Sequence, residues 1–154
     1  MRALTQLAGR RGLQVFTGGF ALAMMTEPVV VAPVLSQPSL PIGTDLKHRA
    51  AIDMSDEEIA CVRQRFVREN LSAIALRFKS DANVPDERFA TYKDLFGDRF
   101  ETIELDDIDA APGPTKPHSV LTLHLIDEAG SKTTLAEEHV VNFFRVRAGA
   151  SDTS

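Results

Sequence analysis

Two residues that can exchange protons, Asp81 and His118, stand at places from which a fold could bring them together. Asp81 closes the strand-like run 74–80, and His118 lies further along in a loop with several prolines. An acid after a strand and a histidine on a later loop follow the order of the last two members of a nucleophile–acid–histidine triad. The nucleophile of such a triad precedes both, on a tight turn between a strand and a helix. The order therefore predicts hydrolytic chemistry if that turn carries a nucleophile.

Each of these residues also has a purely structural interpretation. Asp81 precedes a proline and could simply form a turn, because aspartate favours turns. His118 could be a solvated loop histidine, and His124 is its main rival as the candidate base. We prefer His118, because His124 lies between two leucines, where a packed histidine is more common than a catalyst. His48 and His139 are expected on the surface.

The composition is that of one globular domain. The 154 residues are 44% hydrophobic and 25% charged, a balance that argues against disorder and allows a buried core. The net charge of -5 predicts no nucleic-acid partner, because nucleic-acid-binding domains gather Lys and Arg. The single cysteine, Cys61, excludes an internal disulfide framework and is compatible with a reducing compartment.

The N-terminal part has some features of an export signal. Arg10 and Arg11 precede a mildly apolar stretch, 15–25. Two glycines interrupt that stretch, Glu27 ends it, and it is too short to cross a membrane. We therefore expect a cytoplasmic protein with no membrane partner.

Three apolar runs predict strands. They cover 29–35, 73–78 and 100–105, and Pro33 must then lie at a strand end or at a bulge. Helical patterns alternate with these runs, which predicts an α/β fold with a mostly parallel sheet flanked by helices. Because only three or four strands can be found, the chain looks like the second half of a larger fold.

The helices are predicted from caps and apolar stripes. Ser55 forms a capping box with Glu58, and Thr134 is expected to do the same with Glu137 and so to begin the last helix. The last helix is expected to bury Leu135, Val140, Val141 and Phe144. The other two helices are placed at 18–25 and from Pro85, as first helical residue, to Gly97, as the stop.

Four segments resemble the dienelactone hydrolase family of the α/β-hydrolase superfamily. Segments 16–25 and 32–41 are similar to the region that follows the nucleophile in that family. Segment 77–85 resembles its acid loop, and segment 117–122 resembles its histidine loop. The similarity extends from about residue 16 to residue 147, and the segments occur in the order that the family has.

The resemblance implies a site that hydrolyses a small carboxylic ester or lactone without a cofactor. Asp81 would orient the imidazole of His118 and stabilise its cationic form, and His118 would act first as general base and then as general acid. No metal site is predicted: the acidic run at 104–109 is of a kind that usually forms a solvated loop.

The nucleophile position is where the sequence departs from the family. Counting back from the two glycines, the elbow residue is Val15, or Phe16 if the turn is one residue shorter, and neither has a nucleophilic atom. Thr17 is a poor substitute, and 1–14 does not resemble the apolar strand that feeds the elbow. We expect 1–154 to be a single, incomplete α/β-hydrolase domain that lacks N-terminal strands and is weakly active or inactive. The alternative is a non-catalytic half-domain that associates with another chain, or with itself, through an exposed sheet edge.

Overall fold

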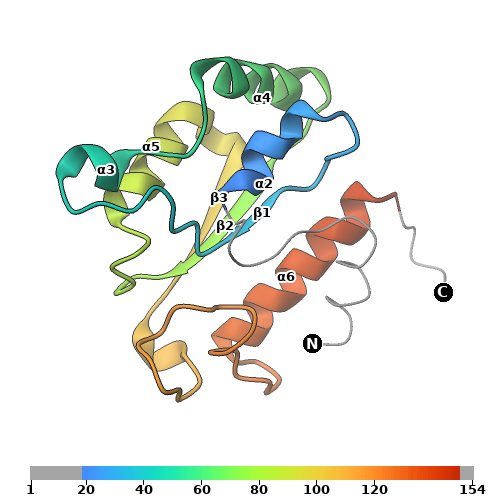
Figure 1. The fold of residues 1–154 in the computed structure, drawn as a ribbon. Coiled ribbons are helices and arrows are strands. Elements are labelled where there is room, and N and C mark those ends of the chain that lie inside the picture. The colour runs from blue at the N-terminus through green and yellow to red at the C-terminus, as the bar shows by residue number, and fades with distance from the viewer. Residues whose placement is uncertain (1–18, 150–154) are drawn as a thin grey trace.

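Three parallel strands form the centre of the protein (Figure 1). The computed structural model describes residues 19–149. Within them the strands are β1 (Val34–Ser36), β2 (Ala73–Phe78) and β3 (Phe100–Leu105), in the order β1-β2-β3. Because all neighbours are parallel, the carboxyl ends of the strands lie at the same edge of the sheet. The predicted α/β class with a parallel sheet is confirmed, and β2 and β3 have the predicted bounds.

The helices lie on both faces of the sheet. Figure 1 shows α2, α4 and α5 on one side of the strands and α6 on the other. The α-helices are α2 (Phe20–Ala23), α3 (Leu46–Ala50), α4 (Asp56–Arg68), α5 (Asp86–Phe96) and α6 (Lys132–Arg147). Short 3-10 turns are η1 (Met24–Thr26), η2 (Gly97–Arg99) and η3 (Asp107–Asp109).

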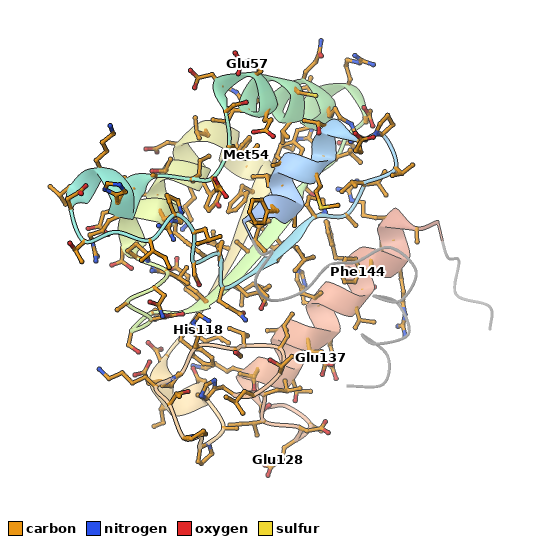
Figure 2. The ribbon with its side chains drawn as sticks, in the orientation of Figure 1. Met54, Glu57, His118, Glu128, Glu137 and Phe144 are labelled. Carbon is orange, nitrogen blue, oxygen red and sulfur yellow. The ribbon has the colours of Figure 1, made fainter. Side chains whose placement is uncertain are left out.

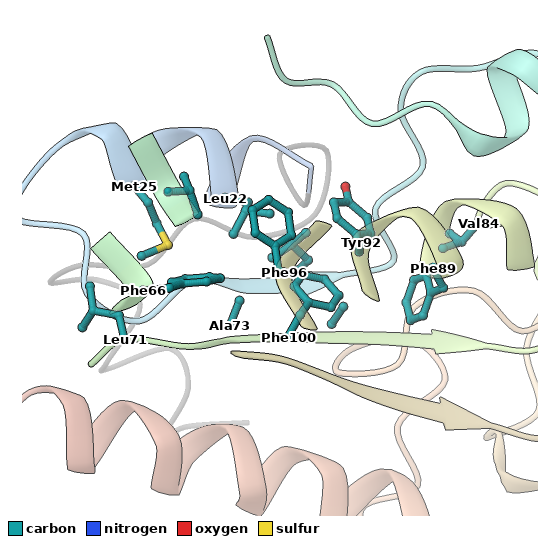
Figure 3. Close-up of a cluster of buried hydrophobic side chains, with 13 residues drawn as sticks. Leu22, Met25, Phe66, Leu71, Ala73, Val84, Phe89, Tyr92, Phe96 and Phe100 are labelled. Carbon is teal, nitrogen blue, oxygen red and sulfur yellow. The ribbon is translucent and has the colours of Figure 1, made fainter. Parts of the chain in front are cut away.

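Strand β2 supplies side chains to two separate hydrophobic clusters. All six of its residues are buried, because successive side chains of a strand point to opposite faces and helices cover both. Ala73 and Ala75 face the first cluster, where small side chains leave room for aromatic rings (Figure 3). That cluster joins α2, η1, α4 and α5 through Leu22, Met25, Val62, Phe66, Phe89, Tyr92 and Phe96. The second cluster lies under α6 and contains Ile74, Leu76, Phe78, Ala136, Val140 and Val141.

The first strand is shorter than its apolar run predicts. β1 begins only after Pro33, and Val29 is 73% exposed. The guanidinium of Arg65, on α4, accounts for the difference. It donates hydrogen bonds to the carbonyl oxygens of Met25, Glu27, Pro28 and Val30, which holds this stretch as a turn rather than as strand backbone. The prediction of a strand over 29–33 is therefore wrong.

The caps of two helices also differ from the prediction. Helix α6 begins at Lys132, because the hydroxyl of Ser131 accepts the hydrogen bond from the backbone N–H of Thr134. The predicted cap at Thr134 is wrong, and Leu135 is 51% exposed, whereas Val140 and Val141 are buried as predicted. Pro85 is the N-cap of α5 rather than its first residue.

Two other helix boundaries follow the prediction. The capping box of Ser55 and Glu58 begins α4, with both of its hydrogen bonds formed. Gly97 ends α5 with a φ of 55°, which favours glycine. No helix within residues 19–149 combines the length and the apolar character that crossing a membrane requires.

Candidate functional site

Asp81 lies just beyond the carboxyl end of the central strand. Its backbone N–H donates to the carbonyl oxygen of Phe78, and its own carbonyl oxygen accepts from the N–H of Val84. One carboxylate oxygen, Oδ1, accepts a hydrogen bond from the N–H of Asn83 at 3.0 Å. The side chain is only 4% exposed. Asp81 is therefore a turn residue, as its structural interpretation predicts, and its second carboxylate oxygen, Oδ2, remains available to a partner.

That partner is His118. The Nδ1 atom of its imidazole lies 2.5 Å from Oδ2 of Asp81 (Figure 2 labels His118). The predicted acid and the predicted base thus meet, although they come from loops after β2 and β3. Because the carboxylate can only accept, Nδ1 carries the proton, and the neutral ring keeps a lone pair on Nε2.

The pair is electrostatically arranged for acid–base chemistry. The hydrogen bond that His118 donates to Asp81 raises the pKa of His118, and partial burial opposes that effect. The imidazole is 33% exposed, so a small molecule can approach it, whereas the carboxylate is enclosed. No described residue is hydrogen-bonded to Nε2 of His118, which leaves that atom able to take a proton from water or from a hydroxyl or thiol group.

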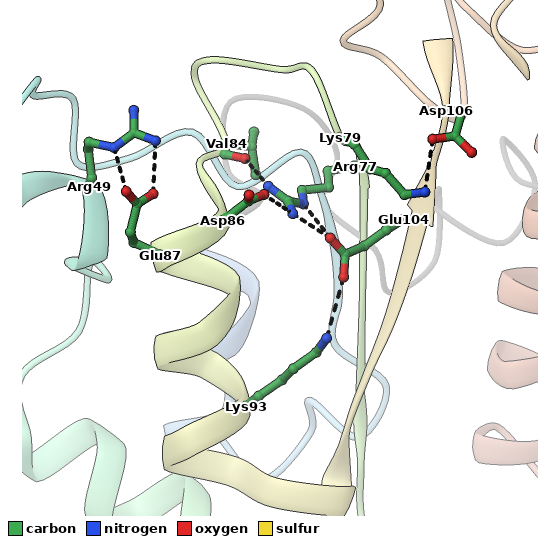
Figure 4. A network of polar contacts seen from close by, with 9 residues as sticks. All are labelled: Arg49, Arg77, Lys79, Val84, Asp86, Glu87, Lys93, Glu104 and Asp106. Carbon is green, nitrogen blue, oxygen red and sulfur yellow. Dashed lines mark hydrogen bonds and ion pairs between the residues drawn. The ribbon is translucent and has the colours of Figure 1, made fainter. Parts of the chain in front are cut away.

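Two buried arginines hold the loop that carries Asp81. Arg77, on β2, donates to the carbonyl oxygen of Val84 and is paired with Asp86 and Glu104 (Figure 4). Arg88, on α5, donates to the carbonyl oxygen of Asn83. Both arginines thus bind backbone next to the acid, which restricts its position.

The sequence interpretation missed Arg88. This side chain is 1% exposed and also donates to the carbonyl oxygens of Pro38, Pro41, His48 and Ala51, so it joins the loop after β1 and the helix α3 to α5. A signal was present in the sequence, because Arg88 is four residues before Tyr92 on the apolar stripe of its helix. A charged residue on such a stripe indicates a buried, hydrogen-bonded role.

The rival histidine, His124, is 1% exposed and is therefore the packed histidine that its neighbours predict. Its Nδ1 atom accepts hydrogen bonds from the backbone N–H groups of His118 and Ser119. His48 and His139 lie at the surface, as predicted, where they pair with acids on their own or a neighbouring element. Cys61 is a half-buried residue of α4.

The nucleophile position is outside the described residues. Val15, Phe16 and Thr17 all precede Gly19, the buried residue that caps α2 and the first that the structure describes. The interpretation of this turn as an elbow without a nucleophile therefore stays a prediction.

The carboxylates of the acidic run after β3 bind lysine and serine side chains of the same chain. Asp106 is paired with Lys79, Asp109 with Lys132, and Asp107 accepts from Ser80. Within residues 19–149, no group of three or more His, Cys, Asp or Glu residues could hold a metal ion.

A cavity of about 380 Å³ lies beside this region and does not include the Asp81–His118 pair. It is lined by Arg77, Lys79, Asp86, Phe89, Ala90, Lys93 and Glu104.

Comparison with known proteins adds no relative. The chain matches no protein-family model, and searches of curated proteins and of solved structures gave no significant match.

Proposed function

We propose that this domain is of the α/β-hydrolase type, related to the dienelactone hydrolases, and that Asp81 and His118 are the acid and base of a carboxylic ester or lactone hydrolase site. The observation that carries the proposal is the hydrogen bond between Oδ2 of Asp81 and Nδ1 of His118. These residues come from distant parts of the chain, in the order that the family resemblance implies. A turn aspartate and a solvated histidine have no need to meet.

The topology supports the proposal. In the α/β-hydrolase pattern the triad residues stand on loops at the carboxyl ends of parallel strands. Asp81 follows β2, His118 follows β3, and the sheet is parallel. A carboxylate at a strand end can be held by backbone while its second oxygen accepts from the base, as Asp81 is held through Phe78 and Asn83.

The chemistry proposed for the pair is a single displacement when no nucleophilic side chain takes part. His118 Nε2 takes a proton from water as the water oxygen attacks the ester carbon. The tetrahedral intermediate then expels the alcohol oxygen, which receives that proton from the imidazolium, so an acid and an alcohol are formed. Because Val15 supplies no nucleophile, we expect turnover to be weak or absent compared with a complete triad.

The test uses the full chain and p-nitrophenyl acetate, with wild type compared with His118→Ala. Loss of hydrolysis in this variant, but not in His139→Ala on the surface of α6, supports the proposal. Equal rates for wild type and His118→Ala would count against His118 as the base.

A gain-of-function variant makes the test decisive if wild type is inactive. Val15→Cys places a thiol at the expected elbow. We expect it to form an acetyl-enzyme that mass spectrometry detects, and to turn over only when His118 is present. If Val15→Cys neither acylates nor accelerates hydrolysis relative to wild type, the elbow assignment is wrong.

Self-association through a sheet edge is the competing proposal, and the edge strand has features that oppose it. β3 lies at one edge of the described sheet and carries Glu101 and Glu104. Charged residues on an edge strand weaken its pairing with another chain. Size-exclusion chromatography with light scattering distinguishes the two proposals, because a monomer of 16.9 kDa is expected if neither edge strand, β1 or β3, pairs with another chain.

A further inference from the structure

The side chain of His124 connects the loop that carries His118 to the strand that precedes Asp81. Its Nδ1 atom lies 3.2 Å from the backbone nitrogen of His118 and 3.1 Å from that of Ser119. Its ring packs edge-on against Phe78, the last residue of β2, with the ring centroids 6.1 Å apart. The backbone at His118 is therefore bonded to a ring that packs against the last residue of β2, the strand that precedes Asp81.

The hydrogen bonds define the protonation state of this ring. Because Nδ1 accepts from two backbone N–H groups, it carries no proton, and the neutral ring has its proton on Nε2. The Nε2 atom is buried without a hydrogen-bond partner among the described residues. Gly113 encloses it, since a Cβ atom at that position would lie 3.0 Å from Nε2.

The unpaired Nε2–H indicates that the histidine is needed for the hydrogen bonds of its other ring nitrogen, Nδ1. Leaving a buried donor unsatisfied is unfavourable, and an apolar side chain in this place would avoid that cost. Within the part of the chain that the structure describes, the other ring nitrogen, Nδ1, is hydrogen-bonded only to the two N–H groups at positions 118 and 119. The backbone closes the same loop, because the N–H of His124 donates to the carbonyl oxygen of Ser119.

We propose that His124 is a positioning residue, whose Nδ1 holds the backbone at 118 and 119 so that the imidazole of His118 stays within hydrogen-bond reach of Asp81. His124 does not contact the carboxylate and acts only through the backbone. The inference rests on the proposed function in one respect, that His118 is the base of the site. The geometry that His124 imposes can be measured without any reaction.

The test is an NMR titration of the histidine side chains in the full-length protein, with wild type compared with His124→Leu and His124→Asn. An asparagine carries its Oδ1 where histidine has Nδ1, so it keeps an acceptor for the two N–H groups, whereas leucine has none. In wild type the contact with Asp81 raises the pKa of His118. We expect His124→Leu to return this pKa toward about 6.5, the value of a free histidine. His124→Asn should retain most of the wild-type value.

A third variant covers the case in which His124→Leu does not fold. His124→Gln is polar like asparagine but carries its amide one carbon further out, away from the position of Nδ1, so its His118 pKa should fall as in the leucine variant. The titration of His139 on α6 serves as the internal reference and should not move.

Two results would overturn the inference. One is a His118 pKa that stays at the wild-type value in both the leucine and the glutamine variants. The other is an asparagine variant that loses the raised pKa as fully as the leucine variant, because the acceptor would then have no special role. If neither wild type nor Val15→Cys hydrolyses an ester while the pKa pattern of His118 appears as expected, the hydrolase proposal fails and the positioning role of His124 stands.

Discussion

The buried guanidinium of Arg88 leads to a strong prediction about stability. Arg88 is 1% exposed and donates to five carbonyl oxygens, all of them on residues that precede α5 in the chain. Burial lowers the pKa of Arg88, yet arginine remains charged at neutral pH. Replacing it with methionine keeps an unbranched aliphatic stem and removes all five donors.

The size of the effect follows from where the five acceptors lie. His48 and Asn83 are exposed, so water can replace the arginine at their carbonyl groups. Pro38 is buried, and Pro41 and Ala51 are half-buried, so their carbonyl oxygens lose a partner that water cannot easily replace. A buried acceptor left unsatisfied costs about 1–3 kcal/mol. Relief of the desolvated charge offsets part of this sum. We expect Arg88→Met to lower the free energy of unfolding by about 3–5 kcal/mol, which is at the upper end for a point mutation.

Urea unfolding followed by circular dichroism measures this difference. Arg49→Met is the matched control, because Arg49 is 35% exposed and, among the described residues, its side chain bonds only to Glu87, which is equally exposed. Exposed ion pairs contribute about 0–1 kcal/mol, so this control should differ little from wild type. If Arg88→Met costs no more than Arg49→Met, the reasoning from buried carbonyl groups is refuted.

Two further predictions concern the acid–base pair and the core. Because Asp81 raises the folded-state pKa of His118, the stability that the charged pair contributes should be present below about pH 6.5 and lost as pH rises through the raised pKa. The unfolding free energies of wild type and Asp81→Asn should therefore differ more at about pH 5.5 than at about pH 9. The two differences should themselves differ by about 1 kcal/mol, a figure kept small because the imidazole is partly exposed. An equal difference at both pH values would show that the charge of His118 adds nothing to stability. In the core, the hydroxyl of Tyr92 is buried with no hydrogen-bond partner among the described residues, and burial raises its pKa. Tyr92→Phe should leave the thermal midpoint unchanged or raise it, whereas a clear drop would mean that the hydroxyl has a partner.

Local spacing in the sequence predicted much of the fold. The unbroken apolar run of β2 indicated a strand covered on both faces, and the spacing of Ser55 and Glu58 indicated the start of α4. Both signals arise between residues that are neighbours in the chain, so they can be recognised without knowing the tertiary structure. The order of Asp81 after a strand and His118 on a later loop likewise indicated a candidate acid and base, and the two side chains do meet.

Tertiary structure alone decided the features that depend on long side chains. Arg65 reaches carbonyl groups some 35 to 40 positions away, and by binding them it converts the first half of a predicted strand into a turn. Arg88 likewise finds acceptors as far away as Pro38, and the ring of His124 meets Phe78 of another element. Hydrophobic periodicity indicates which residues are buried, but it does not indicate which distant backbone groups a buried polar side chain will bind. The sequence thus determined the candidate acid and base, and the folded chain determined the arginines and the histidine that hold them.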